Sequence, residues 1–430
     1  MKTSAKVLLA GTCLTLGFTL CNSASAGDVT IATVNNGDMI RMQRLSKTFE
    51  EQHPDIKLKW VVLEENVLRQ RLTTDIATKG GQFDVLTIGM YEASLWGAKG
   101  WLKEMSDLPA SYALDDVFPS VRDGLSVDGK LFALPFYAES SITYYRKDLF
   151  QAAGLTMPER PTWTQISEFA DKLTDKSKDR YAYALQSRRG ETQSADSFMR
   201  FLWPFGGSLL DAGFKSNLNS KASQQGLQFR QDLMKFMPPG IVDYDHNEAV
   251  NALAQGKVAM ITEWSAFYST LADPGKSKIT DCLAVATEPK GPAGLKPALG
   301  GFSLGVNAHS DDKQKAAAWL FIQWVTSEAM ARPYLDAGGV SGRMSVYKDA
   351  DVQKKYPFVQ PMVTSWEGGV PDYRPRFPQW PEISEVVGEN GTAIMLGKSS
   401  VQDGAKAIGT KMEDILKKAG YYDGKVKLLK

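Results

Sequence analysis

A regular alternation of short apolar strands and amphipathic helices near the start constrains the fold of this chain more than any other feature. The pattern predicts strands at residues 29–32, 56–62 and 83–88, with helices beginning at Asp38, at Val67 and just after Gly89. This order is typical of a mostly parallel α/β sheet. Ligands of such sheets bind beyond the carboxyl ends of the strands. Asn36, Tyr91 and Glu92 follow strand ends and are therefore candidate ligand contacts.

A second informative stretch covers residues 126–145. Asp128-Gly129 is a strong signal for a two-residue hairpin turn, because Gly adopts positive φ at little cost. The strand after it ends at Pro135, and residues 142–145 predict another strand. Glu139 lies between the two as a lone carboxylate. We expect the chain to cross here between two lobes, with Glu139 facing a ligand held between them.

Length and composition limit the class of protein. The chain of 430 residues predicts two or three domains. Hydrophobic residues make up 43% of the chain and charged residues 23%. This balance indicates a soluble globular chain. The net charge of +1 gives no electrostatic reason to expect binding to nucleic acid or to an anionic membrane surface.

The N-terminal segment, residues 1–26, has the pattern of a secretory signal peptide. Lys2 and Lys6 precede an apolar run over residues 7–20, and Ala24-Ser25-Ala26 is a small-residue cleavage site. The mature chain is therefore predicted to start at Gly27, with a net charge of −1.

Cysteine usage agrees with export to a bacterial periplasm. Cys13 and Cys21 lie in the predicted signal peptide, so Cys282 is left alone. A single thiol excludes an intramolecular disulfide and a multi-thiolate metal site in the mature chain.

Catalytic and metal-binding motifs are absent or incomplete. Residues 301–305 match the G-x-S-x-G nucleophile elbow, but a strand continues past Ser303 where the elbow requires a helix. Asp243, Asp245 and Asn247 have calcium-loop spacing without the glycine and the terminal glutamate of such a loop. The histidines lack metal-ligand spacing, and surface positions are the better interpretation for them. We therefore predict neither an enzyme nor a metal or cofactor site.

Aromatic and polar side chains at the ends of predicted elements remain as candidate ligand-binding residues. They are Asn36, Tyr91, Glu92, Glu139, Arg188, Trp203, Asp211, Trp264, Arg343, Trp366 and Tyr373. Carboxylates, amides and guanidinium groups bind neighbouring hydroxyls, and flat rings cover C–H faces, so this set suits a neutral polyhydroxylated ligand. For each Trp a core position is an open alternative, and Arg188 and Asp211 can equally be solvated loop residues.

Several motifs, in a fixed order along the chain, resemble one known family. They are Phe83-Asp84-Val85, the run from Asp128 to Pro135, the run from Ala254 to Met260 leading to Glu263-Trp264, and Leu299-Gly300-Gly301-Phe302 before Ala316-Ala317-Ala318-Trp319. The chain resembles the extracytoplasmic solute-binding proteins of carbohydrate ABC importers, in the group that includes maltose-binding protein. Tyr181-Ala182-Tyr183, Gly342-Arg343-Met344-Ser345 and the run from Tyr373 to Pro378 are most similar to the sorbitol/mannitol-binding members.

The resemblance implies a two-lobe periplasmic-binding-protein-like fold of type II, closed over its ligand by a hinge. The expected first lobe comprises residues 27–138 and 289–340, and the second comprises 139–288 and 341–430. By position, Tyr91, Glu92, Glu139 and Trp264 correspond to sugar-contacting residues of the family, and Gly301 joins the candidate set.

The function that the resemblance implies is capture of a sugar alcohol in the periplasm and its delivery to a membrane permease. A hexose or small oligosaccharide is the alternative ligand. A secreted carbohydrate-active enzyme, with Glu139 paired with Glu92 or Glu263, is a more remote alternative. We expect a monomer that binds no nucleic acid.

Overall fold

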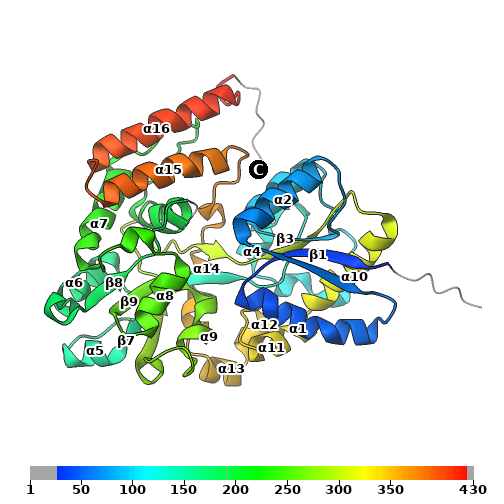
Figure 1. The fold of residues 1–430 in the computed structure, drawn as a ribbon, viewed down its shortest axis with the longest axis horizontal. Coiled ribbons are helices and arrows are strands. Elements are labelled where there is room, and N and C mark those ends of the chain that lie inside the picture. The colour runs from blue at the N-terminus through cyan, green and yellow to red at the C-terminus, as the bar shows by residue number, and fades with distance from the viewer. Residues whose placement is uncertain (1–26, 191, 424–430) are drawn as a thin grey trace, which may run out of the picture.

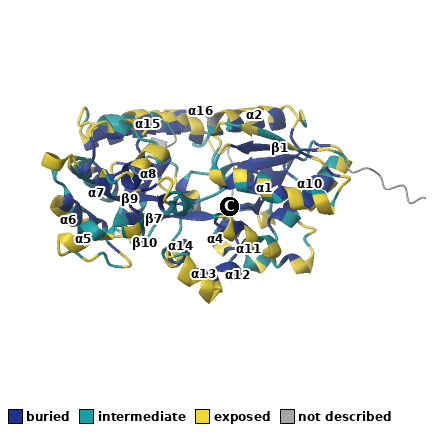
Figure 2. Cartoon of the chain, turned by 60° about the horizontal axis from the view of Figure 1, so that its bottom comes forward, coloured by how far each residue is buried: buried dark blue, intermediate teal, exposed yellow. Residues whose placement is uncertain are grey.

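The computed structural model describes residues 27–190 and 192–423, which form two lobes of mixed sheets and helices (Figure 1). The signal peptide predicted at residues 1–26 lies outside the described residues. Each lobe has a sheet whose central strands are buried, while most exposed residues lie on the outer helices and loops (Figure 2). Among the described residues, none of the helices combines the length and apolarity needed to cross a membrane.

The first lobe is built on the alternating segment that the sequence predicts. Its sheet has the order β2-β1-β3-β12-β6, with β1, β2 and β3 parallel and β12 antiparallel to β3. The strands are β1 Val29–Val34, β2 Leu58–Leu63, β3 Val85–Ile88, β12 Ser303–Val306 and β6 Leu134–Pro135. The main helices are α1 Gly37–Gln52, α2 Glu65–Ala77, α3 Met90–Ala98 and α10 Asp312–Val325.

The start of α1 differs from the expectation. Asn36, and not Asp38, is the N-cap, because its side-chain oxygen accepts a hydrogen bond from the backbone N–H of Met39 at 2.9 Å. Such a bond satisfies one of the free N–H groups at a helix start. Asp38 is instead the second helical residue, and its carboxylate is buried.

The second lobe has a mostly antiparallel sheet in the order β10-β7-β9-β8, with β11 paired to β7. The strands are β7 Glu139–Arg146, β8 Tyr181–Ala184, β9 Val258–Trp264, β10 Leu283–Thr287 and β11 Leu299–Gly300. Its helices include α5 Lys147–Ala152, α6 Trp163–Leu173, α7 Lys221–Leu233, α8 His246–Ala254, α9 Tyr268–Leu271, α14 Val359–Glu367, α15 Trp380–Met395 and α16 Val401–Lys418.

A small hairpin precedes the crossing between the lobes. β4 Ser126–Val127 pairs with β5 Lys130–Leu131, and Asp128 and Gly129 both have positive φ, at 50° and 75°. The turn predicted at Asp128-Gly129 is therefore confirmed.

Two antiparallel chain segments connect the sheets side by side. The outgoing segment leaves β6 at Pro135 and enters the second sheet as β7 at Glu139. In the returning segment, Gly300 pairs with Glu139 of the second sheet and Ser303 pairs with Pro135 of the first. The returning chain therefore changes sheets between Gly300 and Ser303. The sequence pattern of residues 299–306 predicts a single strand. This prediction is wrong, because β11 and β12 belong to different sheets.

Gly301 makes this change of direction possible. Its φ is +105°, and a Cβ atom there would overlap the carbonyl oxygen of Tyr137 on the outgoing segment. The return to the first sheet thus comes after Gly300, later in the chain than the boundary expected at residue 289. A third connection runs through α11 Glu328–Asp336, α12 Ser345–Lys348 and α13 Ala350–Lys355 to α14.

Candidate functional site

Polar side chains from both lobes gather at the junction of the lobes, and we call this group the polar cluster. The N-terminal end of α1 and the outgoing segment form its first-lobe side. The Asn36 side-chain amide donates a hydrogen bond to the Tyr137 hydroxyl at 3.1 Å. The Asp38 carboxylate accepts hydrogen bonds from the Tyr334 hydroxyl and from Arg41. Burial raises the pKa of Asp38 above its usual range.

Glu139 lies at the centre of the cluster as the first residue of β7. Its side chain is buried, and one carboxylate oxygen accepts a hydrogen bond from the backbone N–H of Ala266 at 3.3 Å. Burial raises the pKa of Glu139 well above its ordinary value, and the negative charge of Asp38 raises it further. A hydroxyl group that donates to this carboxylate would stabilise its ionised form.

The second-lobe side of the cluster is centred on His246, the first residue of α8. Its Nδ1 lies 2.8 Å from a carboxylate oxygen of Glu263, and its Nε2 lies 3.4 Å from one of Asp196. Burial alone would lower the pKa of His246, but Glu263 and Asp196 outweigh it and hold the pKa well above the usual range. The surface position expected for His246 is corrected: the side chain is mostly enclosed, because α8 begins against the end of β9.

Aromatic rings border the same region. Trp264 ends β9 and meets Tyr373 edge to face, with 6.2 Å between ring centroids. Gly300 lies against the Trp264 ring, and a Cβ there would come within 2.6 Å of it. The Tyr373 hydroxyl and one oxygen of Asp196 are buried without a hydrogen-bond partner among the described residues. Buried polar atoms of this kind can bind a ligand hydroxyl.

Charged residues of α2 and α3 form the edge of the cluster nearest the second lobe. Arg69 pairs with Glu65 at 2.8 Å and with Glu92. Burial would raise the pKa of Glu65, but Arg69 and then Arg374 of the second lobe lower it, which indicates attraction across the lobes. Glu92 is already engaged, because its other oxygen accepts a hydrogen bond from the backbone N–H of Gly89 at 3.0 Å.

The structure therefore brings together part of the predicted set. Asn36, Glu139, Trp264, Gly301 and Tyr373 lie in or against the polar cluster. Tyr91 packs against both hydrophobic cores, and Glu92 lies at the edge of the cluster.

The other predicted side chains are engaged elsewhere. Arg343 is buried, and its guanidinium donates hydrogen bonds to the carbonyl oxygens of Tyr112, Ala113 and Thr326. It therefore stabilises the backbone packing near the third connection. Trp366 is a core residue, packed against the ring of Phe118.

Arg188 and Asp211 belong to surface loops. Arg188 bonds the carbonyl oxygen of Asp243 and pairs with Asp245 and Glu248. Asp211 is exposed and organises a turn, and Trp203 lines a separate apolar pocket described below.

Sequence reasoning missed Asp38, Tyr137, Asp196, His246 and Arg374. Two of these carried a weak signal: Arg374 lies in the motif from Tyr373 to Pro378, and Asp38 lies close to Asn36. Asp196 and His246 are recognisable only once α8 and the π-helix Thr192–Phe198 are placed side by side. Within residues 27–190 and 192–423, no three His, Cys, Asp or Glu side chains are grouped to hold a metal ion.

A two-lobe fold with a polar cluster at the lobe junction defines a ligand-binding protein that encloses a small solute between its lobes. The chain belongs to the family of bacterial extracellular solute-binding proteins, whose model matches residues 36–332. It is 43% identical to a mannitol-binding protein of Pseudomonas aeruginosa over 98% of this chain and 100% of that protein.

Solved structures agree with this family. An ABC transporter solute-binding protein from Agrobacterium vitis with bound D-mannitol has a TM-score of 0.82 and 40% identity, covering 92% of this chain and 99% of its own. One from Agrobacterium radiobacter in complex with ribitol has a TM-score of 0.82 and 30% identity, covering 90% of this chain and 98% of its own.

Proposed function

We propose that this protein binds a sugar alcohol of the mannitol class in the polar cluster and delivers it to the membrane permease of an ABC transporter. The observation that carries the proposal is Glu139, a buried carboxylate at the junction of the lobes that accepts a hydrogen bond from the Ala266 N–H. Similarity to a mannitol-binding protein and to mannitol- and ribitol-bound structures supports the choice of ligand class.

The chemistry of the cluster favours a neutral ligand rich in hydroxyl groups. Hydroxyls would donate to Glu139 and to the unpartnered oxygen of Asp196, and accept from Asn36 or Tyr373. The Trp264 ring would cover C–H groups of the carbon chain. Several buried carboxylates also disfavour sugar acids and sugar phosphates, because like charges at close range repel.

Both lobes contribute to the cluster, so ligand binding would couple to closure. Asn36 and Asp38 belong to the first lobe, while Asp196, His246 and Glu263 belong to the second. A ligand that contacts both sides shifts an open–closed equilibrium by the difference between its affinities for the two states.

Calorimetry with D-mannitol, D-sorbitol, ribitol, glucose and maltose tests the ligand class. We expect the polyols to bind with micromolar or tighter dissociation constants, where 1 μM corresponds to about −8 kcal/mol. Binding of glucose or maltose with no binding of any polyol would replace the proposal by the hexose or oligosaccharide alternative.

The remaining parts of the proposal concern location and activity. We propose a periplasmic monomer, exported by the signal peptide predicted at residues 1–26, that binds no nucleic acid and has no catalytic activity. Hydrolysis of an oligosaccharide by the purified protein would contradict the last point. Mass measurement of the protein from the periplasm would test cleavage before Gly27.

A further inference from the structure

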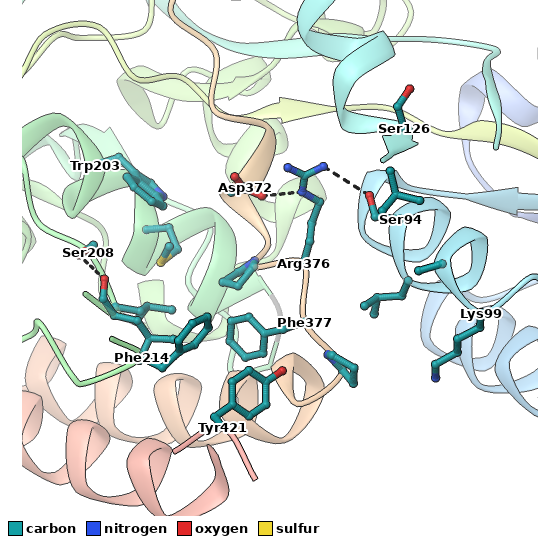
Figure 3. Close-up of a pocket in the computed structure, with 18 residues that line it drawn as sticks. Ser94, Lys99, Ser126, Trp203, Ser208, Phe214, Asp372, Arg376, Phe377 and Tyr421 are labelled. Carbon is teal, nitrogen blue, oxygen red and sulfur yellow. Dashed lines mark hydrogen bonds and ion pairs between the residues drawn. The ribbon is translucent and has the colours of Figure 1, made fainter. Parts of the chain in front are cut away.

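The lobes face each other across an apolar pocket that lies apart from the polar cluster. The pocket has a volume of about 470 Å³ (Figure 3). Residues of α3 form its first-lobe wall, and Trp203, Phe377 and Tyr421 are among the second-lobe residues that line it. A hydrogen bond from Arg376 to the Ser94 hydroxyl spans the two walls, and its length of 3.4 Å makes it a weak one. The lobe junction is therefore open on this side and bridged by a weak polar contact.

Arg41 of α1 makes a closer contact between the lobes. Its guanidinium donates a hydrogen bond to the Ser269 hydroxyl of α9 at 3.0 Å. Its other nitrogens donate to the carbonyl oxygen of Ala337, at the end of α11, at 2.9 Å and to the Asp38 carboxylate at 3.2 Å. The Arg41 side chain is only 14% exposed, so solvent and salt screen these bonds less than those of a surface residue. Because α1 belongs to the first lobe and α9 to the second, the bond to Ser269 joins the lobes directly.

Both ends of the Arg41–Ser269 bond lead to candidate ligand contacts. On the first-lobe side, Arg41 holds the Asp38 carboxylate. On the second-lobe side, the Ser269 hydroxyl donates to the carbonyl oxygen of Ala266 at 3.2 Å. The N–H of the same Ala266 donates to Glu139 at 3.3 Å. A continuous run of hydrogen-bonded residues therefore connects Asp38 with Glu139 across the lobe junction.

The charge of Arg41 supports the same contact. Burial raises the pKa of Asp38, and the positive charge of Arg41 opposes this shift. Burial also raises the pKa of Glu139, and the negative charge of Asp38 raises it further. The two carboxylates thus repel each other when both are ionised. Arg41 offsets this repulsion at the place where the lobes meet.

We propose that the Arg41–Ser269 hydrogen bond is a latch that couples ligand binding at Asp38 and Glu139 to closure of the lobes. Opening of the lobes would separate α1 from α9 and break the latch. Ligand hydroxyls that donate to the two carboxylates fix the groups at both ends of the latch, so the latch favours the ligand-bound arrangement by population shift. Arg41 and Ser269 are positioning residues, because they act through their neighbours. The coupling rests on the proposed polyol binding, whereas the contact between the lobes does not.

A double-mutant cycle on the affinity for D-mannitol tests the latch. Ser269→Ala should raise the dissociation constant about three- to tenfold, as expected for the loss of a mostly buried hydrogen bond. In an Arg41→Met background, Ser269→Ala should have no further effect, because the hydroxyl has already lost its donor. Ser177→Ala, which removes a hydroxyl bonded to Asp175 within its own turn, is the control and should leave the affinity unchanged. Equal effects of Ser269→Ala in both backgrounds, or no effect in either, overturn the latch.

Disulfide trapping follows the same contact without relying on the Arg41 variant. A Cβ at Gly338, just past the end of α11, would lie 3.5 Å from the Cβ of Ser269. A disulfide requires Cβ atoms about 3.5–4.5 Å apart. With the native cysteines replaced by serine, Gly338→Cys and Ser269→Cys should form a disulfide on mild oxidation, and D-mannitol should raise its rate about fivefold. The matched control combines Gly338→Cys with Lys276→Cys, an exposed position beyond α9.

The outcomes of the trapping separate the latch from the proposed function. Equal rates for the two cysteine pairs overturn the contact between the lobes. A rate that D-mannitol leaves unchanged, in a chain that binds D-mannitol, overturns the coupling. Absence of D-mannitol binding by the unaltered chain contradicts the proposed function and the coupling with it, while preferential trapping of the Gly338 and Ser269 pair would still support the contact.

Discussion

The polar cluster and the apolar pocket both lie between the lobes, yet they are built in opposite ways. The cluster places ionisable groups such as Glu139, His246 and Glu263 on or beside the crossing strands, where buried networks orient them. The pocket uses rings and aliphatic side chains from loops and helix ends. Under the proposed function the cluster recognises the solute, whereas the apolar pocket lies where α3 of the first lobe faces loops and helix ends of the second.

The largest expected effect concerns recognition by the cluster. Glu139→Ala should weaken D-mannitol binding by about 10- to 100-fold, because a hydrogen bond to a charged group contributes about 1.5–3 kcal/mol. Unfolding stability should not fall, since the change removes a buried carboxylate with little compensation. Calorimetry and urea unfolding measure the two quantities. Glu51→Gln, at an exposed position of α1, is the control, and an unchanged affinity in Glu139→Ala would remove Glu139 from the site.

The next prediction concerns the close packing of the two crossing segments at Gly301. Gly301→Ala should lower the free energy of unfolding by about 1–3 kcal/mol more than Gly294→Ala. Gly294 has a similar φ of +99° with open space around it, whereas a Cβ at Gly301 overlaps Tyr137. Urea denaturation of both variants separates the overlap from the cost of positive φ. Equal losses would show that the close packing at the crossing adds nothing.

His246 should make the stability of the protein depend on pH. Its folded-state pKa is raised, so its stabilising contribution is complete below about pH 6.5 and is lost as the pH rises through the folded pKa. Each unit by which the folded pKa exceeds the unfolded one corresponds to about 1.4 kcal/mol.

Comparison of the unaltered chain with His246→Gln isolates this contribution. The difference in unfolding free energy should shrink from pH 6 to pH 10. A difference that stays constant over this range would mean that the charge on His246 does not stabilise the contacts with Glu263 and Asp196.

The smallest expected effect on affinity concerns Arg376, which lines the apolar pocket. Arg376→Ala removes the hydrogen bond to Ser94. A partly exposed contact of this kind contributes about 0.5 kcal/mol. The dissociation constant for mannitol should therefore rise about twofold. Arg332→Ala, which loses an exposed ion pair with Asp336 in α11, is the control and should leave affinity unchanged. A tenfold rise of the dissociation constant in Arg376→Ala would show that Arg376 takes part in ligand recognition. The polar cluster and the apolar pocket would then not differ in role.

Local patterns in the sequence predicted most elements of the first lobe and its α/β class, and the family resemblance implied the two-lobe fold. Alternating strands and helices predict the first lobe, and the Asp128-Gly129 turn is formed as expected, because Gly129 adopts positive φ at little cost. The strand end at Pro135 and the strand expected over residues 142–145 also predict the crossing, although β7 begins earlier than expected, at Glu139 itself.

The tertiary structure alone decided which side chains meet. Leu299–Gly300 and Ser303–Val306 look like one strand in sequence, and only the sheets that they join reveal the returning segment. Arg343 and Trp366 have the chemistry of ligand contacts but are engaged by distant carbonyl groups and rings. His246, Asp196 and Glu263 come together from separate elements. Local sequence determines backbone conformation through near neighbours, whereas a binding site depends on contacts between residues far apart in the chain.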